Sequence, residues 1–306
     1  MSTRTLRLAA LAAAGFVTAA AHAELGATHV AGNLYMISGA GANVAVSVGD
    51  SGVMIVDSGS AAMTPQLLAK IREISPGALR YIVNTSIAPD HMGGNAALRA
   101  AGATFTGGNA TVVGGVDVGA AIVAPEAALL RLSESNVPVA AQPTETFYVP
   151  KVDYYFNGEP VLLYHQPRAL DDTNVAVHFR RSDVIVTGDI FRLDQYPKID
   201  LQHGGSIHGV LDSLNFFVDV AVSDTLSEGG TLLIPGHGRV CDEGDLVRYR
   251  DMVTIIRDRV ARMKELGKTL AQIKAAKPTL DYDSRFGAKE WTGDDFVAAV
   301  YASLGT

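Results

Sequence analysis

Cysteine and long apolar segments are scarce in this sequence. Only one of its 306 residues is cysteine, so no intramolecular disulfide can stabilise the fold. After the N-terminus no apolar run is long enough to cross a bilayer. Because 48% of the residues are hydrophobic and 19% charged, the composition is that of a globular protein stabilised by its core. The single Cys241 is then expected to be a small buried apolar side chain.

Positive charge is also in short supply. The formal net charge is −7, and it becomes −9 if residues 1–23, which contain two arginines and no acid, are removed. A nucleic-acid partner would require a basic face. The charge therefore argues against nucleic acid and says little else. We expect a small-molecule ligand or substrate, whose identity the sequence does not give.

The N-terminus has the pattern of an export signal. Arg4 and Arg7 precede the apolar stretch from Leu8 to Ala21, and Ala21-His22-Ala23 supplies a small-x-small cleavage pattern. An uncleaved membrane anchor is the alternative, disfavoured because the stretch is short and rich in alanine. We therefore expect a signal peptide over 1–23 and a periplasmic or secreted mature chain, without a membrane span, that forms a single domain over 24–306.

Strand-like and helix-like patterns alternate in two successive halves of the chain. This alternation predicts sheets covered by helices, a layered α/β or α+β domain. The segment 107–119, rich in glycine and valine, is expected to be a loop. Expected strands cover 34–38, 44–48, 53–56, 81–84, 152–156, 161–164, 175–179, 184–187 and 231–234, and expected helices cover 64–74, 95–101, 207–220, 245–266 and 292–304.

Ligand-type side chains follow three of the expected strands. Asp90 and His91 are adjacent in the loop 85–94, Asp189 follows 184–187, and His237 stands between two glycines after 231–234. Strand ends are where layered α/β architectures gather their sites. Each segment alone is also compatible with a turn, an Asx cap or a hydrogen-bonded loop.

Taken in order, these segments resemble the metallo-β-lactamase superfamily. Its Thr-His-x-His-x-Asp-His-x-Gly-Gly loop is matched in frame by Thr85 to Gly94, and its Gly-Asp-(Leu/Ile)-Phe strand end by Gly188 to Phe191. Its Pro-Gly-His-Gly is matched by Pro235 to Gly238, and an upstream Val-Asp-(Ser/Thr)-Gly turn by Val56 to Gly59. The resemblance covers nearly the whole mature chain, and the chain looks like a member of an exported, hydrolase-like subgroup. It implies that family's fold, a four-layer αββα sandwich.

Three of the family's metal-binding histidines are missing. By the resemblance they fall on Ser86, Ala88 and Leu170, and together they would have formed the first metal site. Alanine and leucine have no ligand atom, and a neutral serine hydroxyl is a poor ligand for zinc. The first metal site is therefore expected to be lost.

The four residues of the family's second metal site all remain. They are Asp90, His91, Asp189 and His237, and two imidazoles with two carboxylates suit one Zn²⁺, Fe²⁺ or Mn²⁺. A closed four-ligand site would be structural, whereas three ligands and a water would leave the site competent to activate that water.

Three interpretations follow from this pattern. In the first, the chain is a pseudo-enzyme or ligand-binding protein with one structural metal ion or none. In the second, it is a mono-metal hydrolase of an ester, lactone, thioester or amide, with Asp90 orienting the nucleophile. In the third, the remaining polar residues bind no metal. His165, His203 and His208 are the candidates to replace a lost ligand, although each is more readily a surface or hydrogen-bonded histidine.

Overall fold

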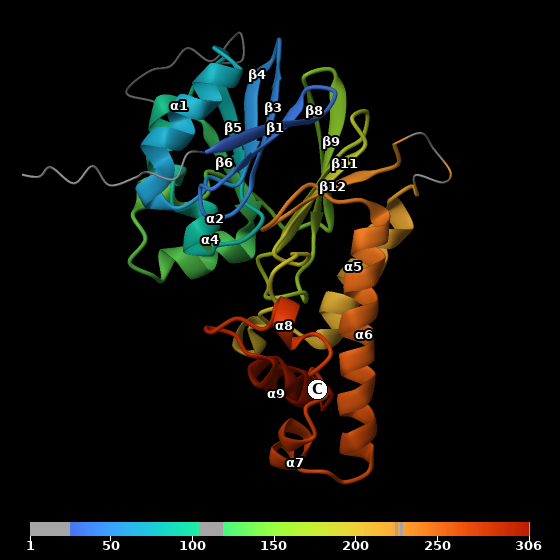
Figure 1. The fold of residues 1–306 in the computed structure, drawn as a ribbon. Coiled ribbons are helices and arrows are strands. Elements are labelled where there is room, and N and C mark those ends of the chain that lie inside the picture. The colour runs from blue at the N-terminus through green and yellow to red at the C-terminus, as the bar shows by residue number, and fades with distance from the viewer. Residues whose placement is uncertain (1–24, 104–118, 224–225, 227–228, 306) are drawn as a thin grey trace, which may run out of the picture.

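The computed structural model describes residues 25–103, 119–223, 226 and 229–305. Two β-sheets lie face to face and helices cover their outer sides (Figure 1). The expected four-layer sandwich is therefore confirmed. The expected signal peptide over 1–23 and nearly all of the segment 107–119 lie outside the described residues.

The first sheet contains seven strands in sequence order. Its first four strands pair antiparallel and its last four pair parallel. The strands are β1 (Gly26–Ala31), β2 (Leu34–Ser38), β3 (Val44–Gly49), β4 (Gly52–Val56), β5 (Leu79–Val83), β6 (Ala121–Pro125) and β7 (Glu145–Phe147). The helices of this half are α1 (Thr64–Ile74), α2 (Pro89–Met92), α3 (Asn95–Ala101) and α4 (Glu126–Ser133).

The second sheet has the order β12-β11-β10-β9-β8, antiparallel except for the parallel pair β11 and β12. Its strands are β8 (Lys151–Phe156), β9 (Glu159–His165), β10 (Val175–Phe179), β11 (Val184–Gly188) and β12 (Leu232–Pro235). The helices of this half are α5 (Ile207–Val220), α6 (Glu243–Glu265), α7 (Leu270–Ala275), α8 (Asp283–Phe286) and α9 (Gly293–Ser303). The lower part of α6 extends beyond the sheets, where α7 and α9 pack against it (Figure 1).

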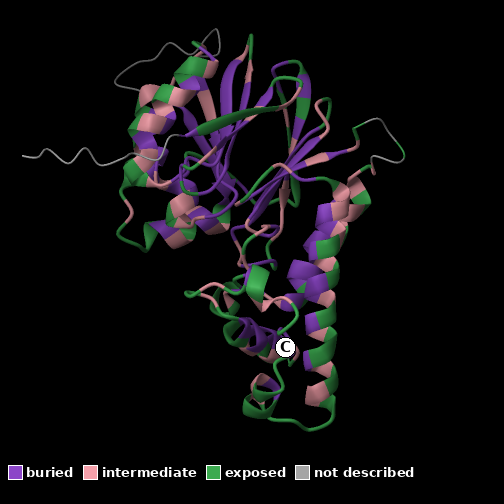
Figure 2. Cartoon of the chain, in the orientation of Figure 1, coloured by how far each residue is buried: buried purple, intermediate pink, exposed green. Residues whose placement is uncertain are grey.

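Alternation along the strands creates separate apolar layers. Met54 and Val56 of β4 face the second sheet, whereas Ile55 between them faces α1 and α3. In β10, Val177 faces the first sheet and Ala176 belongs to the core formed with α5, α6 and α9. This period of two is what a strand buried on both faces requires. Buried residues accordingly fill the space between the sheets and the inner sides of the helices (Figure 2).

The sequence patterns locate most of the long elements. The predicted helices 64–74, 95–101 and 207–220 agree with α1, α3 and α5, and the helix predicted from 245 begins two residues earlier because Asp242 caps it through the amide of Asp245. The patterns missed β1, β6, β7 and the short helices α2, α4, α7 and α8, which lack a long periodic stripe. Of these, α2 lies within the segment 85–94 that was expected to be a loop. Cys241 is buried, as expected.

Among the residues described, no helix is both long and apolar enough to span a membrane.

Candidate metal centre and adjoining cavity

The candidate site lies where several strands end. Asp57 follows β4, Asp189 follows β11, and His237 comes two residues after β12. Asp90 and His91 lie in α2, after β5. Because β4 and β5 are parallel neighbours, as are β11 and β12, the carboxyl ends within each pair lie at one edge of their sheet.

Glycine allows these segments to approach one another closely. A Cβ atom at Gly236 would lie 2.0 Å from Oδ1 of Asp189. Gly188 has a φ of +56°, and a Cβ there would lie 2.6 Å from the hydroxyl of Thr85. The glycines in the matched motifs therefore set how near the Asp189 and His237 segments come to each other.

His91 is completely buried, and Asp57 fixes its ring. Nδ1 of His91 donates to Oδ2 of Asp57 over 2.8 Å. Asp57 also accepts from the backbone N–H of Thr85 at 2.8 Å and from its hydroxyl at 2.6 Å. With Nδ1 engaged by a carboxylate, Nε2 faces the site, as in metal-binding histidines oriented by an outer carboxylate.

Neighbouring carboxylates determine the charge of His91. Burial alone would lower the pKa of His91, but Asp57 and Asp189 outweigh burial and raise that pKa well above its usual value. For the Asp189 carboxyl the effect of burial has the opposite sign and raises the pKa. His91 and Arg192 outweigh burial and hold this pKa below its usual range. The ring of His91 thus lies between two carboxylates, those of Asp57 and Asp189.

Asp90 and His237 form a second pair beside His91. Nε2 of His237 lies 3.1 Å from Oδ2 of Asp90, and this hydrogen bond lowers the pKa of the Asp90 carboxyl. The same nitrogen is 3.7 Å from Oδ1 of Asp189, and Nε2 of His91 is 3.4 Å from that oxygen. One oxygen of Asp189 therefore lies near both imidazoles.

Three of the four predicted ligands converge closely enough to hold one cation. In the described part of the chain, one ligand atom from each of Asp90, His91 and His237 lies within 4.8 Å of the other two. Nε2 of His91 and Oδ1 of Asp189 are buried and make no hydrogen bond to a described residue. Leaving such atoms unsatisfied is costly, and two imidazoles with a carboxylate suit zinc-type ions. The residues present therefore fit a divalent metal ion.

The fourth predicted ligand, Asp189, forms an ion pair with an arginine through one of its two oxygens. Nη1 of Arg192 donates to Oδ2 of Asp189 at 3.0 Å, and the guanidinium also binds Asp194 at 2.7 and 3.1 Å. The Arg192 side chain is only 13% exposed. Arg192 was not among the residues predicted from the sequence, although its position three residues after the expected ligand Asp189 could have indicated it. Asp189 stands beside the group of three ligands rather than within it.

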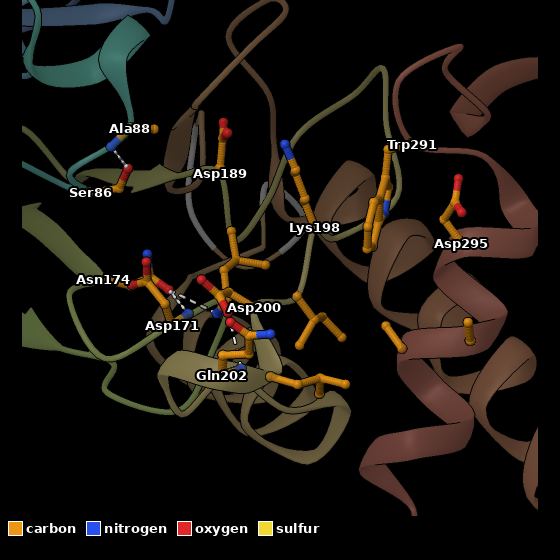
Figure 3. A pocket seen from close by; sticks show the side chains of 15 residues that line it. Ser86, Ala88, Asp171, Asn174, Asp189, Lys198, Asp200, Gln202, Trp291 and Asp295 are labelled. Carbon is orange, nitrogen blue, oxygen red and sulfur yellow. Dashed lines mark hydrogen bonds between the residues drawn. The ribbon is translucent and has the colours of Figure 1, made fainter.

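The three positions that lack histidine all face one cavity. Ser86, Ala88 and Leu170 line a cavity of about 650 Å³ that also borders Asp189 (Figure 3). The hydroxyl of Ser86 accepts from the N–H of Ala88 at 3.0 Å, and the N–H of Leu170 donates to Asn174 at 2.8 Å. The polar groups named here are therefore engaged in local hydrogen bonds. The small or apolar side chains at the three positions leave open space in the cavity.

None of the three candidate replacement histidines points to the ligand group: two form hydrogen bonds elsewhere and one is exposed. Nε2 of His165 donates to the carbonyl of Asp172 at 2.8 Å, and Nδ1 of His203 donates to Asp200 at 2.6 Å. His208 is exposed in the first turn of α5. None of the three belongs to the ligand group that the described residues form, so none replaces a lost ligand there.

Comparison with known proteins gives a family match. The model of the family described as the metallo-beta-lactamase superfamily matches residues 38–238. No curated protein matches the sequence significantly.

Solved structures share the fold at low sequence identity. A double mutant of the sec-alkyl sulfatase PisA1 aligns with a TM-score of 0.68 and 15% identity, over 92% of this chain and 50% of the sulfatase. A metallo-beta-lactamase from Pontibacter korlensis aligns with a TM-score of 0.58 and 15% identity, over 75% and 99%. The DIM-1 metallo-beta-lactamase gives 0.57 and 18%, over 76% and 98%. The chain spans about half the length of the sulfatase, and such identities show the fold alone.

Proposed function

This chain belongs to the metallo-β-lactamase superfamily, and on that premise we propose that it is a ligand-binding member that holds one divalent metal ion and lacks two-metal hydrolysis. The observation that carries the proposal is the cavity of about 650 Å³ at Ser86, Ala88 and Leu170, where the family's first metal site would be. Because two of these side chains have no ligand atom, a second ion has little to bind it there.

The side chains that would hold the single ion are Asp90, His91 and His237. Asp57 supports this role because it fixes the His91 ring with Nε2 toward the site. When bound, a zinc-type ion would supply a Lewis acid able to polarise a carbonyl or to acidify a water.

A mono-metal hydrolase of an ester, lactone, thioester or amide is the second candidate. One observation favours it: among the described residues three ligands rather than four converge, and Asp189 lies beside them with Oδ2 held by Arg192. Three-ligand sites keep an open position, and four-ligand sites do not. Asp90 would then orient the attacking water and accept its proton.

Metal content and turnover test both candidates. Elemental mass spectrometry on the chain purified without chelators should find about one metal ion per chain, lost in the Asp90→Ala/His237→Ala variant. A panel of esters, lactones, a β-lactam and a secondary alkyl sulfate then separates the two. Turnover that the double variant loses would establish the hydrolase, and no turnover would support the binding protein. Absence of metal from the parent chain would contradict both.

Export and a small-molecule partner are part of the proposal. Residues 1–23 have the pattern of a cleavable signal, and removing them leaves a charge of −9, which disfavours nucleic acid. Expression with the native N-terminal segment should yield an extracytoplasmic protein whose intact mass is that of a chain beginning at Glu24. A cytoplasmic protein of full mass would contradict export.

A further inference from the structure

Lys198 brings an ammonium group to the cavity beside the metal centre. It is exposed between the buried residues Pro197 and Ile199. Figure 3 shows its side chain extending between those of Asp189 and Trp291, which line the same cavity. Within 25–103, 119–223, 226 and 229–305, no hydrogen bond or ion pair engages its Nζ atom.

Acidic side chains around the cavity already have cationic partners. Asp189 accepts from Arg192 at 3.0 Å. Asp171 lies 3.0 Å and Asp200 3.9 Å from the guanidinium of Arg131. Arg131 also pairs with Asp172 at 2.9 Å and Arg192 with Asp194 at 2.7 Å, so carboxylates already share both arginines. Lys198 is therefore the cation of the cavity wall that is still available to a ligand.

One further carboxylate, that of Asp295, is engaged by the start of α9. Its Oδ2 accepts from the N–H of Thr292 at 2.9 Å and from the Thr292 hydroxyl at 2.6 Å. In Figure 3 the ring of Trp291 stands between Asp295 and Lys198, and these two described residues form no ion pair with each other. The end of the cavity at Lys198 is therefore the end suited to an anion.

The backbone is anchored on both sides of Lys198. After it, the N–H of Asp200 donates to the carbonyl of Leu170 at 2.8 Å, and two contacts hold the residues before it. The indole Nε1 of Trp291 donates to the carbonyl of Pro197 at 3.1 Å. The ring of Tyr196 stacks on that of Phe296 in α9, with centroids 5.0 Å apart and planes inclined by 7°. A cation on a fixed segment loses less freedom when it binds a ligand, which favours affinity.

Apolar side chains form the rest of the wall. Leu170 and Ile199 lie on one side, and Trp291 and Ala299 come from the C-terminal segment. A volume of about 650 Å³ is within the range that accommodates small organic ligands. Trp291 and Ala299 lie outside the 38–238 region that matches the family, so this wall is a feature of the chain's own C-terminal helices.

We propose that the cavity binds an organic carboxylate whose anionic group pairs with Lys198 and whose apolar or aromatic body lies against Leu170 and Trp291. This inference rests on the proposed ligand-binding function and names the ligand class. It concerns the cavity wall and does not depend on whether Asp90, His91 and His237 hold a metal ion.

The test uses Trp291, which is the only tryptophan of the chain, as its own reporter. The probe is 4-(4-nitrophenyl)butyrate, because a nitroaromatic ring quenches tryptophan emission on contact. Its neutral amide and the corresponding amine are the matched ligands. We expect saturable quenching by the carboxylate, and binding by the amide and the amine that is weaker by about two- to fivefold, the scale of a partly exposed ion pair.

Substitutions of Lys198 test whether this side chain pairs with the carboxylate of the probe. Lys198→Met should weaken carboxylate binding to the level of the amide, and Lys198→Arg should retain it. Lys289→Met, which removes the same charge from an exposed lysine near Trp291 but outside the cavity wall, should change nothing. Circular dichroism verifies that each variant is folded.

Several outcomes would overturn the proposal. These are the absence of saturable binding, equal or tighter binding of the amine, and an unchanged affinity in Lys198→Met. The Asp90→Ala/His237→Ala variant separates this proposal from the metal proposal. Carboxylate binding should persist in that variant, and metal content measured on the same sample reports the metal site independently.

Discussion

His91 and Asp57 are joined by a hydrogen bond of 2.8 Å between Nδ1 and Oδ2, and neither side chain has any exposure to solvent. An ionised carboxylate can only accept, so Nδ1 carries the hydrogen and Nε2 remains directed at Asp189. Asp57 has a φ of +67°, an uncommon conformation for a residue other than glycine. This pair therefore sets the orientation of the most buried candidate ligand.

Replacing Asp57 by asparagine should weaken metal binding. An amide can donate to Nδ1 of His91, and the hydrogen would then move to Nε2, which faces the site. Asparagine tolerates positive φ, so the turn should keep its conformation. We expect metal affinity to fall by roughly 10- to 100-fold, as for other outer partners of metal ligands, when measured by competition with a chromophoric chelator. Asp50→Asn, at an exposed position, is the control. Equal affinities would mean that Asp57 has only a structural role.

Arg192 and a metal ion should compete for Asp189. Replacing Arg192 by methionine removes the guanidinium that fixes the carboxylate through Oδ2, so that the carboxylate can shift toward Asp90 and become a fourth ligand. We expect tighter zinc binding, and loss of any hydrolysis, because a fourth protein ligand closes the open position. Without added metal the variant should lose on the order of 3 kcal/mol of unfolding free energy, since Asp189 loses its cation in a buried setting.

Thermal unfolding with and without zinc measures the Arg192 effect. The rise in Tm that zinc causes should be larger in Arg192→Met than in the parent chain. Arg257→Met, which removes an arginine paired with Asp258 at the surface, is the control and should leave that rise unchanged. A smaller zinc effect in Arg192→Met would show that Arg192 supports the site rather than competes with it.

Local pattern and motif order predicted much of the fold and the ligand group. The helix at 64–74 was readable because Leu67 and Ile71 repeat on one face, and the structure buries both. Asp90, His91 and His237 were readable because each belongs to a motif at a strand end, and the structure brings the three together. Motifs of this kind record short-range geometry, which the chain's own backbone dictates.

Contacts between distant segments were not readable in the same way. Asp57 was recognised only as part of a turn, although it holds His91, 34 residues away. Trp291 meets Pro197 across 94 residues, through helices that carry no motif. The first pair depends on the pairing of β4 with β5 and the second on where the segment before α9 packs, and no local period encodes either. The group of three ligands also differs from the predicted four, because a motif specifies a position and not the partner that Arg192 provides.

Restoring the missing histidines should rebuild the first metal site. Ser86, Ala88 and Leu170 face one cavity, so Ser86→His, Ala88→His and Leu170→His would place three imidazoles around the same space. We expect the metal content to rise from about one to about two ions per chain. The buried Leu170 contributes to the core, so the variant should be roughly 2 kcal/mol less stable.

A matched control separates ligation from volume in this experiment. Asparagine at the same three positions adds polar side chains that are poor zinc ligands, and metal content should stay at the parent level. If the triple histidine variant folds and also stays there, the loss of the site involves backbone position as well as side chains.

His178 should make the fold sensitive to mild acid. It is buried in β10, and neither ring nitrogen has a hydrogen-bond partner among the described residues. Burial, with Arg180 nearby, lowers the pKa of His178, although Asp183 at 3.6 Å opposes this. The unfolded chain therefore binds a proton near its usual pKa of about 6.5, before the folded chain does. Stability from this group is complete above that pH and is lost as the pH falls toward the folded pKa.

Urea unfolding at pH 7.5 and 5.5 tests this origin of acid sensitivity. His178→Phe has no group to protonate at that position, so its free energy of unfolding should fall less between the two pH values than that of the parent chain. His208→Gln removes an exposed histidine and should keep the parent's dependence. Comparing differences between variants cancels the contribution of His91, whose raised pKa acts in the opposite direction. An unchanged difference between the two pH values in His178→Phe would show that His178 is not the origin of the acid sensitivity in this range.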